Sequence, residues 1–205
     1  TRYEGRVAHP MDKAERRAQI LTHARDVFAK RGYHAAKIDD IVAAAKVARG
    51  TFYLYFEDKR AIFEEIVDRA FTRLGMVITR VDTQDPSRSV EEQVKDNVRR
   101  IVAVLLEDRA TTKILLSDAV GLDPAFDRKL LVFYDEALKL IEESIREGQE
   151  LGIVKPGNAR IQAVLAMGAM KEILYQVVMR DLDLDEDAIV AGLYELFSRG
   201  FLALS

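Results

Sequence analysis

Apolar residues recur at helical spacing along almost the whole chain, and no segment alternates apolar and polar residues as a half-buried strand does. The first helix is predicted between Asp12, which can cap its start, and Gly32, which can end it. Its apolar positions fall at i, i+1, i+4, i+7 and i+8, and they are Ile20, Leu21, Ala24, Val27 and Phe28. The pattern predicts an all-α protein of about nine helices.

Two short helices are predicted next, at about residues 39–45 and 49–56, and a longer fourth helix follows the capping residue Asp58. The polar segment 82–89 contains an Asp-Pro pair and is typical of a linker. These features predict an N-terminal domain of small helices, residues 1–60 with an arm at residues 1–11, and a second domain, residues 61–205.

The second domain is predicted to be a helical bundle. Ser89 and Glu92 have the spacing of a capping box, which opens the fifth helix. The helices of this part are predicted at about residues 89–106, 111–120, 124–150, 159–180 and 185–204.

Charge is divided unevenly between the two predicted domains. The whole chain has a net charge of −3, but residues 1–60 carry 13 Lys and Arg against 8 Asp and Glu, while the remainder carries 18 against 26. A basic N-terminal part on an acidic body is the asymmetry expected where one end of a protein meets phosphates.

Cysteine is absent from the sequence, which excludes disulfides, thiolate catalysis and zinc fingers and fits a reducing cytoplasm. No apolar run reaches the roughly 18 residues that a membrane span needs. We therefore expect a cytoplasmic protein without a membrane partner.

Residues 37–56, KIDDIVAAAKVARGTFYLYF, have the pattern of a helix-turn-helix. The first helix is predicted to turn Ile41, Ala44 and Ala45 inward, and a turn at Lys46-Val47 leads to the second. Two short helices joined by a tight turn can place the second one in the major groove of DNA. Its leading end must be slim to enter a groove ~12 Å wide, and Gly50 and Thr51 meet that need.

The second short helix is amphipathic in a way that suits this task. Phe52 and Phe56 are predicted to face the core and to hold the helix rigidly. Groups that can reach DNA are the hydroxyls of Thr51, Tyr53 and Tyr55 and the cations of Arg49 and Lys59.

Residues 12–63 resemble the N-terminal domain of the tetracycline-repressor (TetR) family. The shared residues are Ile20, Ala24, Phe28, Gly32, Tyr33, Ile41, Ala44, Val47, Gly50-Thr51-Phe52-Tyr53, Tyr55-Phe56, Lys59 and Phe63. The resemblance implies an all-α homodimeric repressor with a ligand pocket in its C-terminal domain. It also implies operator contacts from the positions that match Lys37, Ala48, Arg49, Thr51, Tyr53, Tyr55 and Lys59.

Three positions depart from that family's pattern. Lys37 and Ala48 stand where the family usually has a hydroxyl residue that caps a helix, and losing a cap costs about 0.5–2 kcal/mol. Lys46 stands where the family usually has glycine, so a left-handed backbone there would store roughly 1 kcal/mol of strain.

Catalytic and metal-binding patterns are not found in the sequence. His9, His23 and His34 have no metal-ligand spacing, and the chain has neither a Gly-x-Ser-x-Gly elbow nor a phosphate-binding glycine loop. We therefore expect no cofactor, no metal and no enzyme activity.

A ligand pocket is predicted among the helices of residues 61–205, where a small apolar or amphipathic effector would bind. The candidate lining residues are Phe71, Leu74, Leu105, Phe133, Tyr134, Met167, Met170 and Tyr175. Apolar residues at helical spacing more often form an ordinary core than the lining of a ligand pocket. Met adapts its shape to varied apolar guests, and Gly168 between two Met either permits close helix approach or opens space.

The last two helices are predicted to form the dimer interface, because each is apolar on more than one side. The residues concerned are Ile161, Val164, Leu165, Ile173, Leu174, Val177, Val178, Ile189, Val190, Leu193, Leu196, Phe197 and Phe201. Burial of all of them within one thick monomer is the alternative.

A ligand-responsive repressor follows from these interpretations, with two recognition helices ~34–36 Å apart on a pseudo-palindromic operator. Binding of an effector would move the fourth helix and lower the affinity for DNA. Two alternatives remain: a regulator governed by a protein partner, and a helical carrier or enzyme with a vestigial helix-turn-helix.

Overall fold

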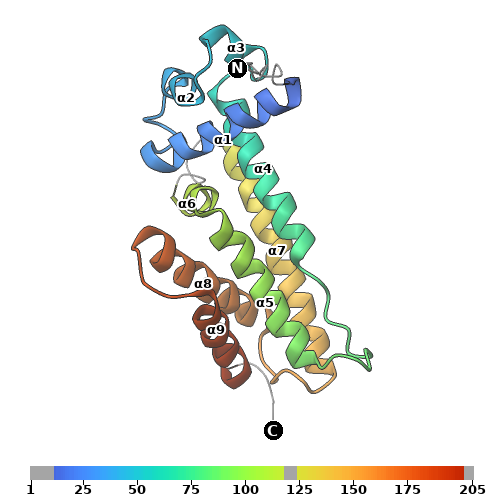
Figure 1. The fold of residues 1–205 in the computed structure, drawn as a ribbon. Helices are drawn as coiled ribbons and strands as arrows, with labels where there is room; N and C mark the ends of the chain where they lie inside the picture. The colour runs from blue at the N-terminus through green and yellow to red at the C-terminus, as the bar shows by residue number, and fades with distance from the viewer. Residues whose placement is uncertain (1–11, 118–123, 201–205) are drawn as a thin grey trace, which may run out of the picture. The chain divides into compact units, whose positions relative to one another are not determined.

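A computed structural model describes residues 12–117 and 124–200, and in these ranges the chain forms nine α-helices and no β-strand (Figure 1). The helices are α1 Lys13–Arg31, α2 Ile38–Ala45, α3 Arg49–Tyr53, α4 Lys59–Val77, α5 Val90–Glu107, α6 Arg109–Ser117, α7 Pro124–Glu150, α8 Ala159–Met179 and α9 Glu186–Gly200. The prediction of an all-α fold is confirmed. The predicted arm at residues 1–11, His9 and Phe201 lie outside the described residues.

Local side-chain hydrogen bonds begin the helices where the sequence predicts. The backbone N–H of Glu15 donates to Asp12 Oδ1 at 2.7 Å, and Glu15 accepts in return from the N–H of Asp12 at 3.0 Å. Ser89 and Glu92 form the same reciprocal pair at the start of α5. Both predicted helix starts are confirmed, since each depends on residues only three positions apart.

The chain divides into two units, Thr1–Ile66 and Val67–Ser205. Unit 1 holds α1, α2 and α3 and has an aromatic core. Phe28 and Phe63 are fully buried and meet edge to face at 5.2 Å, and Phe52 packs against Phe56 at 5.7 Å. Full burial of one such side chain contributes roughly 1.5–3 kcal/mol, so a few aromatic rings can stabilise a unit of this size.

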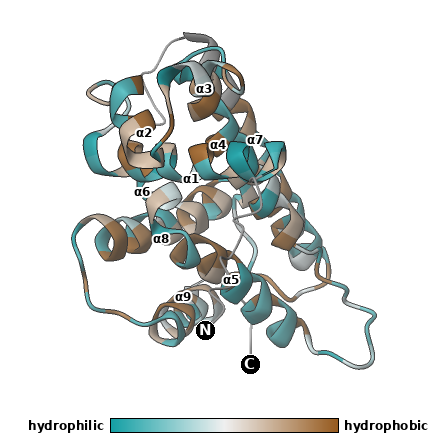
Figure 2. Cartoon of the chain, turned by 45° about the horizontal axis from the view of Figure 1, so that its top comes forward, coloured by the Kyte–Doolittle hydropathy of each residue, from teal (hydrophilic) through white to brown (hydrophobic). Residues whose placement is uncertain are grey.

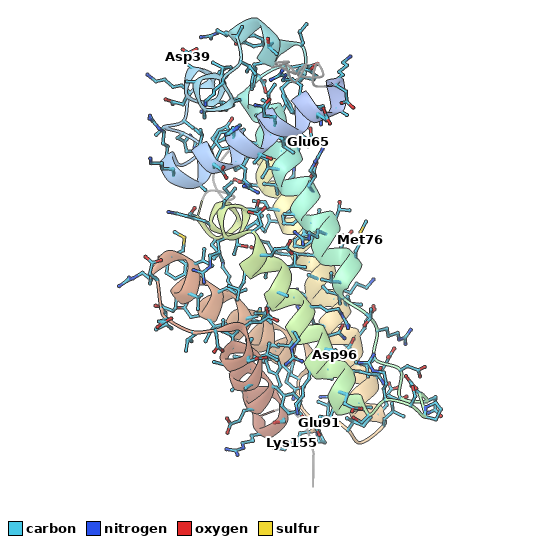
Figure 3. All side chains as sticks on the ribbon, in the orientation of Figure 1. Asp39, Glu65, Met76, Glu91, Asp96 and Lys155 are labelled. Carbon is cyan, nitrogen blue, oxygen red and sulfur yellow. The ribbon has the colours of Figure 1, made fainter. Side chains whose placement is uncertain are left out.

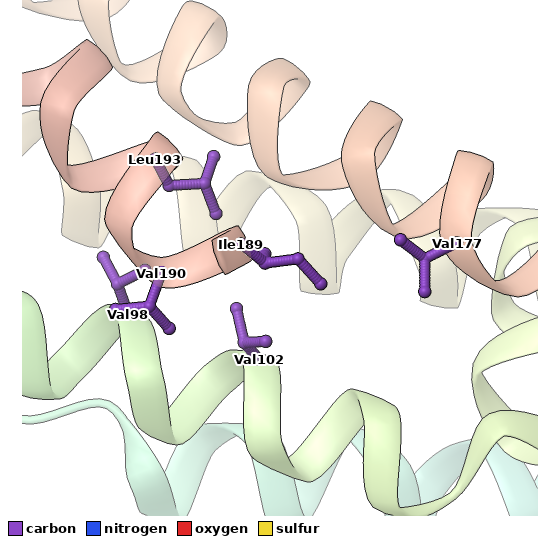
Figure 4. Close-up of a cluster of buried hydrophobic side chains, with 6 residues drawn as sticks. All are labelled: Val98, Val102, Val177, Ile189, Val190 and Leu193. Atoms are coloured by element: carbon purple, nitrogen blue, oxygen red, sulfur yellow. The ribbon is translucent and has the colours of Figure 1, made fainter. Parts of the chain in front are cut away.

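Unit 2 has an aliphatic core between α5, α8 and α9 (Figure 4). Val98 and Val102 project from α5 toward α9, and Val177 projects from α8. The buried members from α9 are Ile189, Val190 and Leu193. This packing buries four of the thirteen residues predicted for the dimer interface, Val177, Ile189, Val190 and Leu193, and Leu174 of α8 is buried as well. For these five residues the interface prediction is wrong, because they complete the monomer's own core.

The turn after α7 fixes the start of α8. The backbone N–H groups of Ile153 and Val154 both donate to the carbonyl of Gly148, at 2.8 and 3.0 Å. A Cβ added at Gly148 would lie 2.5 Å from Val154 Cγ2, so this close approach requires glycine.

The segment between α4 and α5 lies inside unit 2 and is held by three polar side chains on one face of α5. Gln93 accepts from the backbone N–H of Asp82 at 2.7 Å and donates to its carbonyl at 2.8 Å. Asn97 pairs in the same way with Thr79, at 2.9 and 2.6 Å, and Arg100 donates to the carbonyl of Val77 at 2.9 Å. We call Gln93, Asn97 and Arg100 the α5 clamp. Because the clamp satisfies backbone groups on both sides of Arg80, this connection is anchored to α5 although most of it is polar.

Helix α8 carries an apolar stripe that its own subunit leaves uncovered. Ile161, Val164 and Leu165 are each about half exposed, with fractions of 57, 49 and 55%. Hydrophobic residues, brown in Figure 2, recur along α8, and by length and composition alone this helix could cross a membrane. A single helix of that kind is weak evidence for a membrane, because a core helix of a soluble protein can have the same length and composition.

Candidate nucleic-acid interface

Helices α2 and α3 are joined by a turn that ends α2 in a left-handed residue. Lys46 has φ 53° and ψ 44°, and the N–H of Val47 donates to the carbonyl of Val42 at 3.0 Å, which closes the helix end. The condition under which Lys46 would store strain is therefore met. Glycine would adopt this conformation without the strain that a side chain incurs.

The inward face of α2 differs from the predicted one. Ile41 and Ala45 are buried, but Ala44 is exposed and Val42 is buried in its place. Positions i, i+1 and i+4 lie on one side of a helix, whereas Ala44 lies three residues after Ile41 on the edge that faces outward here. The assignment of Ala44 to the core is therefore wrong.

Helix α3 is shorter than predicted, because it ends at Tyr53 instead of residue 56. Five residues cannot sustain an isolated helix, and its N-cap, Ala48, makes no side-chain hydrogen bond. Phe52 is fully buried and Phe56 is 3% exposed, so both core predictions are confirmed. Burial of these two rings therefore holds α3 in place of a cap.

The outer side of α3 carries the other residues of the motif. Ala48, Arg49, Gly50 and Tyr53 are exposed, and Thr51 and Tyr55 are half-buried. A Cβ added at Gly50 would meet nothing within 4 Å, so the fold does not require glycine at this position. Leu54, at the end of the helix, is 75% exposed and was missed by the sequence interpretation, which assigned no role to it.

Arg49 is held by partners on both sides of it. Its Nη1 donates to Asp39 Oδ1 of α2 at 2.6 Å, and its Nη2 donates to the Tyr53 hydroxyl at 3.4 Å (Figure 3 labels Asp39). The hydrogen bond to Tyr53 and the charge of Asp39 raise the pKa of the Arg49 guanidinium. The result is an exposed, permanently charged guanidinium positioned beside a tyrosine hydroxyl.

Lys59 begins α4 and points into its own unit. Its Nζ donates to the carbonyls of Tyr33, Ala36 and His34, at 2.7, 2.9 and 3.5 Å, and lies 4.3 Å from the centre of the Tyr33 ring. Burial lowers the pKa of this amine. The ammonium thus closes the loop between α1 and α2, and its predicted phosphate contact stays a prediction.

Lys37, the N-cap of α2, is exposed, and its backbone N–H donates to Asp40 Oδ2 at 2.9 Å. Asp40 also pairs with Arg31, at 3.2 Å. The helix start therefore keeps one half of a capping box although the usual hydroxyl residue is absent.

Arg17 is a residue whose role the sequence did not reveal. It forms a bidentate pair with Glu65 of α4, labelled in Figure 3, and its guanidinium lies 4.7 Å from the centre of the Phe56 ring. Arg17 thus ties α1 to α4 and covers the ring that supports α3. The signal was weak, because an arginine on α1 has the same pattern as any solvated residue.

In unit 2 the structure brings some of the predicted ligand-binding residues together. Phe71 of α4 stacks on Phe133 of α7 at 3.7 Å with an angle of 8°, and Tyr134 lies beside Phe133 at 6.1 Å. Burial raises the pKa of Tyr134. The aromatic candidates of α4 and α7 therefore meet at one place, which residues 62 positions apart in the sequence could not show.

The other candidates have plainer surroundings. Leu74 is buried, and Leu105, Met167 and Tyr175 are half-buried, while Met170 packs against the core of α5 and α9. An added Cβ at Gly168 would meet nothing within 4 Å, so Gly168 does not serve a close approach of helices within this subunit.

Comparison with known proteins places these observations in a family. Residues 20–66 match the family described as bacterial regulatory proteins, tetR family. The chain is 30% identical over 146 residues to the HTH-type transcriptional repressor DhaR of Mycobacterium sp. (strain GP1), which covers 68% of this chain and 70% of that repressor.

Solved structures share the fold over most of the chain. The fatty acid degradation regulator FadR from Bacillus halodurans has a TM-score of 0.74 and 26% identity, covering 92% of this chain and 97% of its own. FadR from Bacillus subtilis, solved in complex with stearoyl-CoA, has a TM-score of 0.70 and 24% identity, covering 89 and 98%.

Proposed function

This chain belongs to the TetR family of bacterial regulatory proteins and is a DNA-binding transcriptional regulator, and we propose that it represses transcription as a homodimer on a pseudo-palindromic operator. The observation that carries the proposal is the outer side of α3. It presents Arg49 and Tyr53 on a helix whose opposite side is fixed by the buried Phe52. A recognition helix must be rigid on one side and polar on the other, and α3 is both.

Each predicted DNA-binding residue receives a role in this proposal. Arg49 and Lys37 contact phosphates, and the Tyr53 and Tyr55 hydroxyls donate to phosphate oxygens. Thr51 reaches a base edge, and Ala48 and Gly50 keep the leading end slim. The exposed Leu54 supplies an apolar surface for a thymine methyl group. Lys59 acts indirectly, because its ammonium orders the loop that precedes α2.

The dimer is proposed to form through the apolar stripe of α8, which consists of Ile161, Val164 and Leu165, together with the exposed Leu196 of α9. Positions i, i+3 and i+4 share one side of a helix, so the stripe is continuous. Two copies brought together by a two-fold axis would cover each other's stripe, which leaves no large apolar area in water.

The effector is proposed to be an amphipathic molecule with a long apolar chain, of the acyl thioester class. FadR from Bacillus subtilis was solved with stearoyl-CoA. The stack of Phe71 on Phe133 and the adjacent Tyr134 give unit 2 an apolar region into which such a chain could insert. Because Phe71 belongs to α4, a ligand that parts the two rings would displace this helix and lower the affinity for DNA.

Selection of bound fragments from random duplex DNA tests the function. We expect the wild type to enrich an inverted repeat, and Tyr53→Ala to lose the enrichment. Tyr53→Phe keeps the ring and removes only the hydroxyl, so it measures how much of the loss comes from the hydroxyl's contact with phosphate. Binding that is weak, abolished by salt and indifferent to sequence would contradict the proposal, because it would reflect phosphate attraction alone.

Fluorescence anisotropy on the selected operator tests the effector. Stearoyl-CoA is expected to release the DNA, whereas coenzyme A without an acyl chain is not. Release by both compounds, or by neither, would contradict the proposed ligand class and leave the DNA-binding proposal standing.

A further inference from the structure

An acidic side chain forms an ion pair with the arginine at the start of the recognition helix. Asp39 of α2 accepts from Arg49 Nη1 at 2.6 Å, and both side chains remain largely in water, with exposed fractions of 67 and 57%. A carboxylate at a DNA-binding surface repels phosphates, so its presence beside Arg49 calls for a physical reason.

Stability does not supply that reason. An ion pair this exposed adds little to a fold. The neighbouring Asp40 already performs the structural work at the start of α2, where it accepts from the N–H of Lys37 and pairs with Arg31. Among the described residues, Arg49 is the partner that the structure gives to Asp39.

The chemistry of the Arg49 guanidinium gives a physical reason for the presence of Asp39. Carboxylate and phosphate oxygens bind the same planar fork of N–H donors. One arm of the Arg49 fork is taken by Asp39, and the other points to the Tyr53 hydroxyl. A phosphate that takes the same arm of the fork therefore competes with the carboxylate, and when the phosphate leaves, the carboxylate can return.

We infer that Asp39 is an internal competitor of the DNA phosphate for Arg49, which lowers operator affinity and speeds release. The inference rests on the proposed function, since it requires Arg49 to contact DNA. The opposing effect is independent of base sequence, because the competing ligand is a phosphate. It occurs twice in a homodimer, once at each recognition helix. A regulator that must leave its operator when an effector binds benefits from a faster dissociation rate, which the returning carboxylate provides.

Asp39→Asn is the decisive variant, because asparagine keeps the shape of the side chain and removes its charge. Relative to the wild type, we expect about fivefold tighter binding by the dimer, both to the selected operator and to an arbitrary duplex, given the modest strength of an exposed pair. Dissociation from the operator should slow by a similar factor. The dependence of affinity on salt should become steeper, because each subunit gains one net positive charge.

A double-mutant cycle with Arg49→Gln tests the pairing itself. The gain from Asp39→Asn should largely disappear in the Arg49→Gln background, where no guanidinium remains to compete for. Asp26→Asn is the control, since it removes one carboxylate from α1 of the same unit and should leave affinity nearly unchanged. Thermal melting of each variant checks that unit 1 remains folded.

Three results would overturn the inference while leaving the proposed function intact. An equal gain in both Arg49 backgrounds would mean simple repulsion of phosphate by Asp39. A loss of operator affinity alone would mean that Asp39 accepts a hydrogen bond from a base such as cytosine. If Asp39→Asn leaves the affinity for DNA unchanged, Asp39 does not compete with the DNA phosphate for Arg49. A wild type that selects no inverted repeat would instead contradict the proposed function, and this is known before any variant is compared.

Discussion

The two units of this regulator differ in how many large apolar side chains they leave exposed to water. In the described part of unit 1 the core is closed, and large apolar side chains are exposed only at Tyr53 and Leu54 on the recognition helix. Unit 2 leaves many more in water, among them Leu131 and Val132 of α7 and the stripe of α8. A surface that is polar apart from its recognition helix suits nucleic acid, whereas a broad apolar surface suits another protein chain. The described part of unit 1 therefore closes its own core, whereas unit 2 leaves apolar surface that a second chain could cover.

Leu165→Glu on α8 is expected to have the largest effect. A dimer formed through this stripe would bury two glutamates without partners, which costs ~4 kcal/mol or more and corresponds to roughly a thousandfold loss of association. Operator affinity should collapse with it, because one subunit can contact only a half-site. Analytical ultracentrifugation and anisotropy on the operator measure the two losses.

Met76→Glu is the matched control for the stripe, since Met76 of α4 is 76% exposed and lies outside it. It should leave the dimer intact. A Leu165→Glu protein that remains dimeric would show that the exposed apolar surface of unit 2 serves something other than self-association.

Phe52→Ala tests whether unit 1 is complete by itself. Removing this fully buried ring is expected to destabilise unit 1 by about 3 kcal/mol. Chemical denaturation followed by far-UV circular dichroism should show one early transition for unit 1 and an unchanged later one for unit 2. Phe52→Leu, which keeps most of the volume, should cost about 1 kcal/mol. Loss of both transitions together would mean that the units do not unfold independently.

Lys59→Met measures the loop closure inside unit 1. Methionine fills similar space but cannot donate to the carbonyls of Tyr33 and Ala36, so we expect a loss of about 2 kcal/mol from these lost hydrogen bonds. Equilibrium urea unfolding of unit 1 gives the value. Lys59→Arg, which retains a cation and several donors, should lose less. An unaffected stability with reduced operator affinity would support the direct phosphate contact instead.

Lys46→Gly is expected to have the smallest effect and the opposite sign. Glycine adopts the left-handed conformation freely, so unit 1 should gain up to about 1 kcal/mol. Lys46→Ala removes the same charge without relieving the backbone and separates the two contributions. A thermal shift of unit 1 in the presence and absence of operator DNA would detect the gain.

Interactions could be predicted from the sequence when the interacting residues lie close together along the chain. The capping box of Ser89 and Glu92 was predictable because both partners lie in one turn. The closure by Lys59 was not, since its acceptors are backbone carbonyls 23 to 26 positions away that any residue would offer. The stack of Phe71 on Phe133 joins two helices whose register no local pattern fixes.

Helix ends and faces were less certain for a related reason. Helix α3 ends at Tyr53 because the chain must turn before the cap of α4 at Asp58, a competition that the apolar spacing of Phe52 and Phe56 conceals. The short α2 has too few residues for its spacing to distinguish Val42 from Ala44 as the buried position.

The α5 clamp gives helix α4 a fixed end. With a rise of 1.5 Å per residue, Phe71 lies ~9 Å from the clamped Val77 along α4. If a ligand parts the Phe71 and Phe133 rings, this part of α4 turns about an end that is held in place. The displacement then grows with distance from Val77, so the clamp acts as a pivot.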